Sequence, residues 1–324
     1  MDSALRALQS YTGIVMPHDL TLAEGAALFL FAAGAAGGIF AAEPTPYSKF
    51  SSKAAPKPLK GEASAKDELS SKGWQVPSRA GMAIIYALGT AAGAYAVASM
   101  AVEADSAGAG TFAGLRVPSL AGIGAVVSAA VTGRSAAAMG GLAAFAHFAK
   151  RELEITFVHS YSGSMPAQSA LFISAVYGVV GWGLHHFAAR VGAGAGLDAS
   201  DAAGPGSVRR AVGGALFVGG MAVNAIHHVM LAKLREAAVS KDGAKKYVIP
   251  RGGLFELVAC PHYFGECLQW AGLAIALPTP LHVLWAAQSL SYLSGRAAHT
   301  TQWYKERFGG AYPSSRRHII PFLY

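Results

Sequence analysis

Long apolar runs are the feature that most constrains how this 324-residue chain can fold. A helix needs about 20 apolar residues to cross the hydrocarbon core of a bilayer. Only 14% of the residues are charged, whereas soluble domains carry about 25%. The sequence therefore predicts an all-α integral membrane bundle of about seven transmembrane helices, in the runs 20–42, 79–103, 117–148, 167–190, 209–232, 254–276 and 278–297.

The third run is too long for one straight crossing of the membrane. In its middle the segment VTGRS, from Val131 to Ser135, interrupts the apolar sequence with glycine and polar residues. We expect either a kink at this point or two shorter helical segments.

The positive charges between the runs predict which loops face the cytosol. Lysines and arginines crowd into residues 43–78, 233–251 and the C-terminal tail, whereas 104–115 and 191–208 contain none. Cytoplasmic loops carry the excess of Lys and Arg in membrane proteins. We therefore expect the basic loops and the C-terminus in the cytosol. This distribution also explains the net charge of +8, so no nucleic-acid partner is predicted.

Ionisable residues inside spans are costly and are functional candidates for that reason. The segment HFAKRELEITFVH, residues 147–159, places Lys150 and Arg151 at the cytosolic end of the third run. These cations could mark the membrane interface and pair with nearby acids. They could equally form a rim that binds the phosphates of a dinucleotide.

A second polar segment is VNAIHHVMLAKLRE, residues 223–236, in which helical spacing turns some polar residues inward. Its adjacent histidines, and a second pair at His185–His186, raise the question of a metal. Membrane di-iron enzymes need several HxxxH and HxxHH boxes, and this chain has neither spacing. No metal site is predicted.

A third polar segment is ACPHYFGECLQW, residues 259–270. Pro261 can begin a helix, because its missing N–H would be unpaired there anyway. Tyr263, Glu266 and Trp270 then share one helix face. An interfacial aromatic belt would explain the two aromatic residues. It would not explain Glu266, a carboxylate one turn deep that must be paired or solvated by a polar cavity.

The final third of the chain resembles the steroid 5α-reductase family, which includes the very-long-chain trans-2-enoyl-CoA reductases and the polyprenol reductases. The resemblance rests on KKYVIPRGGLFELVACPHYFGECLQWAGLAIA and on the terminal WYKERFGGAYPSSRRHIIPFLY. Upstream, HFAKRELEITFVHSYSGSMP is similar to the matching segment of enoyl-CoA reductases, and PYSKF and VPSRAGM resemble elements near the start of steroid reductases. The resemblance implies N-terminal membrane helices over 1–148, with a cytosolic basic loop at 43–78, and a catalytic, NADPH-binding domain over 149–324.

The same resemblance implies a function and a set of site residues. It implies an endoplasmic reticulum protein with a cytosolic C-terminus that reduces an alkene conjugated to a carbonyl, with NADPH as cofactor. Association with other lipid-elongation or sterol enzymes is a further expectation. Arg151 is predicted to lie on the phosphate rim, and the family positions that contact the cofactor match Asn224, Arg235, Tyr247, His262, Glu266 and Tyr304.

The predicted catalytic residues are Tyr263, Lys150 and Tyr86. Tyr263 matches the proposed proton donor of the enoyl-CoA reductases. Steroid reductases hold the 3-ketone with a glutamate and a tyrosine, and an ungapped alignment places Tyr86 and Phe148 at those two positions. Since phenylalanine cannot donate a hydrogen bond, the standard ketone-binding pair is absent. The sequence therefore favours a lipid enoyl thioester slightly over a 4-ene-3-oxo steroid.

A methyltransferase is the main alternative from another class. Isoprenylcysteine and phospholipid methyltransferases share an RHPxYxG-like helix start, which CPHYFGE resembles, and they use S-adenosylmethionine. No arginine precedes Pro261, and Glu306 has no adjacent acid. A membrane protein that has lost catalysis is a further alternative, which loss of nucleotide binding would identify.

Overall fold

The computed structural model describes residues 14, 20–29, 32, 73–105, 110–112, 115–195, 205–238 and 247–324. Most of the predicted cytosolic loop 43–78 and the PYSKF motif lie outside these residues. The elements in chain order are β1 (Gln75–Pro77), α4 (Ser78–Ala104), β2 (Gly110–Phe112), β3 (Leu115–Val117), α5 (Leu120–Val131), α6 (Ala136–Phe157), β4 (Ser164–Pro166), α7 (Ala167–Ala195), α8 (Pro205–Ala237), η2 (Gly253–Glu256), α9 (Pro261–Ala276), α10 (Pro280–Phe308) and η3 (Gly309–Ala311).

The all-α membrane class is confirmed by these elements. Among the described residues, α4, α7 and α8 are each long and apolar enough to cross a membrane, and the α5–α6 pair adds a fourth if it counts as one span. The predicted count of seven spans is not confirmed by this test. Helix α4 lies within one residue of the predicted run 79–103, and α7 begins at Ala167 as predicted. The other bounds differ more, because α9 begins at Pro261 rather than at 254, α6 continues to Phe157 and α10 continues to Phe308. Of the first run, residues 22–29 are described as helical.

The break predicted within the third run is confirmed. Helices α5 and α6 meet at an angle of 103° over a four-residue connection. Gly133 has φ +67°, a left-handed conformation that favours glycine. Ser135 then caps α6, because its side chain accepts a hydrogen bond from the Ala138 backbone N–H. The VTGRS segment therefore ends one helix and starts the next.

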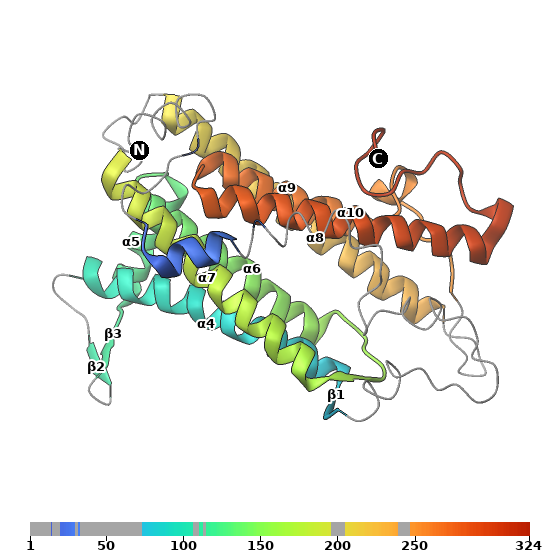
Figure 1. Cartoon of the computed structure of the whole chain (residues 1–324), viewed down its shortest axis with the longest axis horizontal. Helices are drawn as coiled ribbons and strands as arrows, with labels where there is room; N and C mark the ends of the chain where they lie inside the picture. The colour runs from blue at the N-terminus through green and yellow to red at the C-terminus, as the bar shows by residue number, and fades with distance from the viewer. Residues whose placement is uncertain are drawn as a thin grey trace.

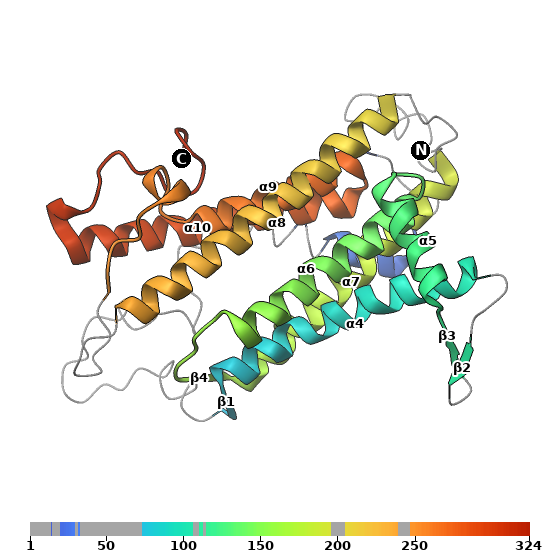
Figure 2. The same cartoon turned by 180° about the vertical axis from the view of Figure 1, so that it is seen from behind.

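The helices form two groups that lie side by side (Figures 1 and 2). The N-terminal group contains α4, α5, α6 and α7, in which α4 packs on both α6 and α7. The C-terminal group contains α8, α9 and α10, in which α8 and α9 make the most extensive contact. The short antiparallel pair β1–β4 ties the start of α4 to the start of α7.

Glycines allow the close approach of α8 and α9. A Cβ added to Gly220 would lie 2.4 Å from the Gln269 backbone nitrogen, and one on Gly213 would lie 2.5 Å from the Ala276 nitrogen. Added Cβ atoms on Gly265 and Gly272 would likewise meet the α8 backbone. Small residues let helix backbones pack closely in membranes, where dispersion contacts rather than hydrophobicity drive association.

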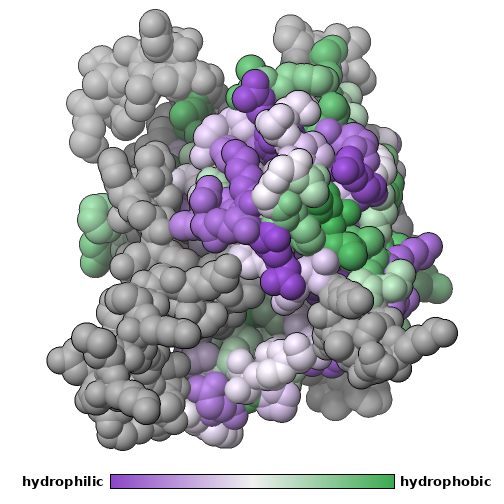
Figure 3. All heavy atoms as spheres, turned by 90° about the vertical axis from the view of Figure 1, so that its right-hand side faces the viewer, coloured by the Kyte–Doolittle hydropathy of each residue, from purple (hydrophilic) through white to green (hydrophobic). Residues whose placement is uncertain are grey.

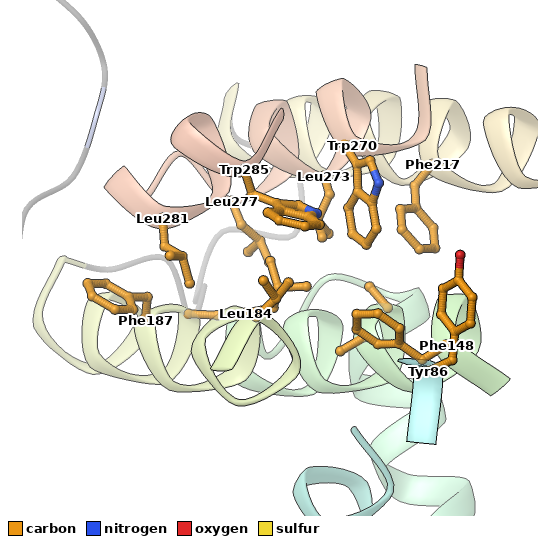
Figure 4. Packing of buried hydrophobic residues seen from close by; sticks show 14 of the residues in the cluster. Tyr86, Phe148, Leu184, Phe187, Phe217, Trp270, Leu273, Leu277, Leu281 and Trp285 are labelled. Atoms are coloured by element: carbon orange, nitrogen blue, oxygen red, sulfur yellow. The ribbon is translucent and has the colours of Figure 1, made fainter. Parts of the chain in front are cut away.

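A core of aromatic and aliphatic side chains joins the two groups. Figure 4 shows the C-terminal group facing the N-terminal one across this core, with side chains from both sides pointing inward. Its members include Trp270, Leu273, Leu277, Leu281 and Trp285 from the C-terminal group and Tyr86, Phe148, Leu184 and Phe187 from the N-terminal group.

The C-terminal tail folds back onto the entry to α9. The Ala259 backbone N–H donates to the Arg317 carbonyl at 2.8 Å, and Val258 forms a parallel bridge with Arg317. Arg316 donates to the Pro250 carbonyl at 3.1 Å. Pro261 is the first residue of α9, as predicted. The end of the molecule that carries this tail presents a concentration of hydrophilic residues (Figure 3).

The division into two domains at residues 148 and 149 stays a prediction. This boundary falls within α6, a single helix that packs on α4 and α7.

Candidate functional site

A cluster of buried polar side chains lies where the two helix groups meet. Helix α6 supplies Lys150, Arg151 and Glu154, and α8 supplies Asn224 and His228. We call these five residues the inner polar cluster. All but Lys150 are at most 8% exposed. Buried charges of this kind are stable only when paired and hydrogen-bonded.

Glu154 is the centre of the inner polar cluster. Its Oε1 forms an ion pair with Lys150 Nζ at 2.8 Å. Its Oε2 accepts a hydrogen bond from Arg151 and lies 3.0 Å from His228 Nδ1. One carboxylate therefore holds two cations and an imidazole in place. The pairing of cations with acids that the sequence left open as an alternative is thus present, but inside the bundle rather than at its lipid-facing surface.

Asn224 connects the inner polar cluster to α9. Its side chain accepts a hydrogen bond from Lys150 and donates one to the His262 carbonyl at 2.8 Å. Both functions of the amide are used, so its orientation is fixed. Three of the predicted site residues, from α6, α8 and α9, are thereby brought together.

Glu266 and Tyr86 complete this side of the site. Glu266, one turn into α9, lies within electrostatic reach of Arg151 and Lys150. The Arg151 guanidinium carbon lies 5.0 Å from the Tyr86 ring centroid, and the phenol is within reach of Glu266. Figure 4 shows the Tyr86 hydroxyl pointing from α4 toward the C-terminal helix group. A carboxylate one turn deep is therefore placed beside cations, which meets the requirement stated from the sequence.

Tyr263 has a different partner. Its hydroxyl accepts a hydrogen bond from Arg296 Nε of α10 at 3.2 Å. Its ring contacts the His262 ring, with centroids 4.2 Å apart. The two predicted catalytic phenols thus face different cations, Arg151 for Tyr86 and Arg296 for Tyr263.

The remaining predicted cofactor residues lie toward the C-terminal tail. Tyr304 is buried and stacks on Tyr312, with centroids 5.5 Å apart and planes 7° apart. Tyr247 is 53% exposed and packs edge-on against Trp303. We call the group Tyr247, Trp303, Tyr304, Phe308 and Tyr312 the outer aromatic cluster.

Cations surround the outer aromatic cluster. Arg307 lies over the Tyr247 and Trp303 rings, at 4.9 and 5.7 Å. Arg235 is exposed at the end of α8 and lies within electrostatic reach of Tyr304. Cations over aromatic faces are attracted by the ring quadrupole. This end of the site therefore combines ring surfaces with positive charge.

Several residues of the site were not identified from the sequence. Glu154, His228, His159 and Arg296 appeared there only as members of polar segments or as charges of the tail. His159 lies just beyond α6, and burial, followed by the charge of Arg151, lowers the pKa of its imidazole to about 4. Burial raises the pKa of the neighbouring Tyr161 phenol to about 12. The HFAKRELEITFVH motif contained the signal for two of them, because Glu154 and His159 both fall within it.

Three ligand-type atoms come together in this region. The side chains of Glu154, His159 and His228 offer atoms within 4.8 Å of one another. Arg151 already donates to the Glu154 carboxylate and lies 3.1 Å from His228 Nδ1. Because a guanidinium occupies the position where a cation would bind, the geometry favours an ion-pair network over a metal centre.

Comparison with known proteins concerns mainly the C-terminal helix group. The family model described as 3-oxo-5-alpha-steroid 4-dehydrogenase matches residues 205–324. The steroid 5-alpha-reductase DET2 of Gossypium hirsutum is 41% identical over 109 residues, which are 34% of this chain and 40% of that protein. Residues 205–324 of this chain are thus similar to the steroid 5α-reductase family.

Mammalian proteins are similar to this chain over a stretch of comparable length. The 3-oxo-5-alpha-steroid 4-dehydrogenase 1 of Rattus norvegicus is 43% identical over 111 residues, 34% of this chain and 40% of that protein. The Homo sapiens protein of the same name is 40% identical over 113 residues, 35% and 41% of the two chains. This chain thus spans 40–41% of the length of these relatives.

The steroid 5α-reductase family match separates the site into two parts. Residues 205–324 contain the six predicted cofactor positions of α8, α9, α10 and the segment before η2. Lys150, Arg151 and Tyr86 precede the match and come from the N-terminal helix group. The candidate site therefore combines a family domain with side chains that the family model does not cover.

Proposed function

We propose that this protein is an NADPH-dependent reductase of a carbon–carbon double bond conjugated to a carbonyl, in a steroid or steroid-like lipid. The observation that carries the proposal is the inner polar cluster beside Glu266 and Tyr86. Donors and charges from four helices converge there on one buried place. Hydrogen-bond donors and charges held in fixed positions can stabilise the charge that develops on a substrate during a reaction.

The residues present fit a dinucleotide cofactor. Arg151 Nε and His262 Nδ1 are buried without hydrogen-bond partners within the described part of the chain, so both can bind a further polar group. Asn224, Glu266 and His262 would hold the reactive end of the cofactor. Arg235, Tyr247 and Tyr304 lie toward the outer aromatic cluster, where cations suit phosphates and ring surfaces suit a base.

The proposed chemistry divides between cofactor and protein. NADPH, when bound, supplies a hydride to the β-carbon of the conjugated system. Negative charge then develops on the carbonyl oxygen, and hydrogen-bond donors must face it. Tyr86, oriented by Arg151, and Lys150 are the donors proposed for that oxygen. Tyr263 is the proposed proton donor to the α-carbon, and the charge of Arg296 stabilises the phenolate that remains.

The comparisons support a steroid more than an enoyl thioester as the substrate class. The similar proteins named above are steroid 5-alpha-reductases and 3-oxo-5-alpha-steroid 4-dehydrogenases. Tyr86 and Phe148, the positions aligned with the ketone-binding pair, are neighbours with ring centroids 6.4 Å apart. Phe148 offers no hydrogen bond, so Tyr86 alone would donate to a ketone there. The lipid enoyl thioester stays a second prediction.

Location and partners follow from the same proposal. The basic loops and the C-terminal end suit a cytosolic face, where NADPH is available, in the endoplasmic reticulum membrane. Other lipid-elongation or sterol enzymes of that membrane are the proposed associates. An S-adenosylmethionine-dependent methyltransferase is the alternative, and it lacks support from the relatives named above.

Cofactor binding to the detergent-purified protein is the first test. Ligands that bind only the native state raise its apparent stability by mass action, by about 2.7 kcal/mol at 100 times the dissociation constant. We expect a rise in the thermal midpoint with NADPH, and none with S-adenosylmethionine. A rise with S-adenosylmethionine alone would replace the reductase by the methyltransferase.

Turnover is measured with progesterone, a 4-ene-3-oxo steroid, and with trans-2-hexadecenoyl-CoA, while NADPH oxidation is followed. Glu266→Gln should lower kcat/KM by about 1,000-fold, because a buried charged hydrogen bond is worth about 4 kcal/mol when the partner group is left unpaired. Glu306→Gln, at an exposed carboxylate of α10, is the matched control and should retain activity. A fully active Glu266→Gln protein would remove this residue from the site.

A further inference from the structure

A hydrogen bond between two buried side chains lies one helical turn from the inner polar cluster, on the side of the apolar core. His147 Nδ1 of α6 and Gln269 Nε2 of α9 are 2.7 Å apart. His147 is 4% exposed and Gln269 is 1% exposed, so water does not compete for this bond. The two residues continue the polar faces of their helices, because His147 precedes Arg151 by four residues and Gln269 follows Glu266 by three.

This hydrogen bond fixes the tautomer of His147. An amide nitrogen can only donate, so Gln269 Nε2 donates and His147 Nδ1 accepts. A ring nitrogen that accepts carries no proton, and the other nitrogen of a neutral imidazole then carries it. His147 is therefore a neutral side chain with an N–H donor at Nε2.

The N–H at His147 Nε2 has no acceptor among the described residues. The bond to Gln269 is the one hydrogen bond that the ring makes within this part of the chain. Buried polar groups are hydrogen-bonded in the great majority of cases, and an unpaired one is costly. An acceptor on a bound molecule would complete the hydrogen bonding of this donor.

The Phe148 ring contacts both His147 and Tyr86. Its centroid lies 5.0 Å from that of the imidazole, in an edge-on contact, and 6.4 Å from that of the phenol. Figure 4 shows Phe148 and Tyr86 next to each other, with Trp270 facing them from the C-terminal helix group. A side chain that cannot donate a hydrogen bond therefore lies against two side chains that can.

The neighbours of His147 hold its ring in place. The Trp270 ring packs on the imidazole with centroids 4.6 Å apart, and Phe148 and Gln269 fix two further edges. Lys150, by comparison, already forms an ion pair with Glu154 and donates to Asn224. A donor that is fixed, buried and uncommitted suits an oxygen on which charge develops, because it need not reorganise during the reaction.

We infer that His147 donates a hydrogen bond from Nε2 to the carbonyl oxygen of the substrate, beside Tyr86, and that Gln269 holds the ring in the required tautomer. The inference rests on the proposed function and adds a catalytic residue to it. As the hydride reaches the β-carbon, negative charge develops on the carbonyl oxygen, and the hydrogen bond stabilises it. Tyr263 supplies the proton to the α-carbon, so His147 keeps its own proton throughout.

Two substitutions of His147 separate catalysis from packing. A glutamine places its amide nitrogen near the position of the imidazole Nε2, whereas an asparagine places its nitrogen near that of Nδ1. His147→Gln therefore keeps a donor for the substrate, and His147→Asn keeps a partner for Gln269. Both are compared with the wild type in the full-length protein with NADPH and whichever probe the wild type reduces, progesterone or trans-2-hexadecenoyl-CoA.

We expect kcat to fall by about 100-fold in His147→Asn, the lower end of the loss when one oxyanion donor is removed, and by less than about 10-fold in His147→Gln. The KM of the substrate should change less than kcat, because the donor acts on charge that develops in the transition state. Gln269→Leu leaves the imidazole free to place its proton on either nitrogen, so its kcat should lie between those of the wild type and His147→Asn. The NADPH-induced thermal shift should be the same in all three variants.

His185→Gln is the matched control, since His185 lies on α7 and bonds to the Ala137 carbonyl at 3.2 Å. If His147→Asn is as active as His147→Gln or more active, the imidazole serves only to pair with Gln269. That result would overturn the inference and leave the reductase assignment intact. A wild type that binds NADPH but reduces neither probe would overturn the proposed function as well.

Discussion

The two ends of the interface between the helix groups differ sharply. At one end Lys150, Arg151 and Glu154 meet Asn224 and His228 in a buried polar network. At the other end leucines, phenylalanines and tryptophans, mainly of α7, α9 and α10, fill the space. Figure 4 shows the second kind of packing, with Tyr86 at its border. The apolar end packs the two helix groups together, and the polar end carries the candidate functional site.

Burial has opposite energetic consequences for the side chains at the two ends. Apolar side chains bury their surface with a favourable free energy of about 25 cal/mol per Å². Charged side chains lose hydration and recover it only through their partners. The polar end is therefore stable as a complete network and unstable when one member is missing. The apolar end loses stability in proportion to the atoms removed.

Glu154→Gln should have the largest effect on stability. The substitution keeps the size of the side chain but leaves Lys150 and Arg151 without their shared counter-charge. Breaking a buried ion pair by removing one partner costs about 3–5 kcal/mol. The thermal midpoint in detergent should drop by several degrees, and NADPH-dependent turnover should be lost.

Glu152→Gln is the control for that experiment. Glu152 lies two residues earlier on α6, and among the described residues its side chain has no ion-pair or hydrogen-bond partner. Its replacement should change stability by less than about 0.5 kcal/mol. If both variants unfold at the wild-type temperature, Glu154 is not the centre of a stabilising network.

The positions of the apolar helices were largely predictable from the sequence. Length and hydropathy located the helices, and proline and glycine placed two of their ends, at the start of α9 and at the α5–α6 break. These features depend on neighbours within a few residues, which a sequence displays directly. Glu266 was conspicuous as a carboxylate within an apolar run, whereas Asn224 and His262 were assigned to the cofactor through the family resemblance.

The partners of these residues were not predictable in the same way. Arg296 follows Tyr263 by 33 residues, and Asn224 follows Lys150 by 74. Such pairs arise from how α6, α8, α9 and α10 pack. The spacing of Gly213 and Gly220 on one helix and Gly265 and Gly272 on the other was visible in the sequence. Its meaning became clear only when the two helices were seen in contact.

Gly220→Ala tests the packing that supports both ends of the interface. The new Cβ would lie 2.4 Å from the Gln269 nitrogen and 2.5 Å from the Gly265 carbonyl oxygen, and backbone atoms cannot move aside cheaply. We expect a loss of about 2–3 kcal/mol, at the upper end of the range for overpacking.

The adjacent Gly219 provides the matched control, because an added Cβ there meets no atom within 4 Å. Gly219→Ala should raise stability by about 0.5–1 kcal/mol through its helix preference. Thermal unfolding of the two variants side by side measures the difference. Equal midpoints would mean that α8 and α9 do not approach as closely as described.

The smallest expected effect concerns the pH dependence of stability, at the border between the polar end and water. Burial and then the charge of Arg151 lower the pKa of His159 from about 6.5 in an unfolded chain to about 4. The unfolded chain therefore binds this proton more readily than the folded protein does. The contribution of neutral His159 to stability is full above pH 6.5 and is lost as the pH falls toward 4.

A shift of one unit corresponds to about 1.4 kcal/mol, so lowering the pH from 7.5 to 5.0 should cost the wild type about 2 kcal/mol at this residue. His159→Gln cannot take up the proton, and its thermal midpoint should fall less over the same interval. The wild type and His159→Gln share the other buried groups of the polar end. The difference between their falls in thermal midpoint therefore measures the contribution of His159. Equal falls would mean that this imidazole is hydrated like one on the surface, and the polar network would then end at His228.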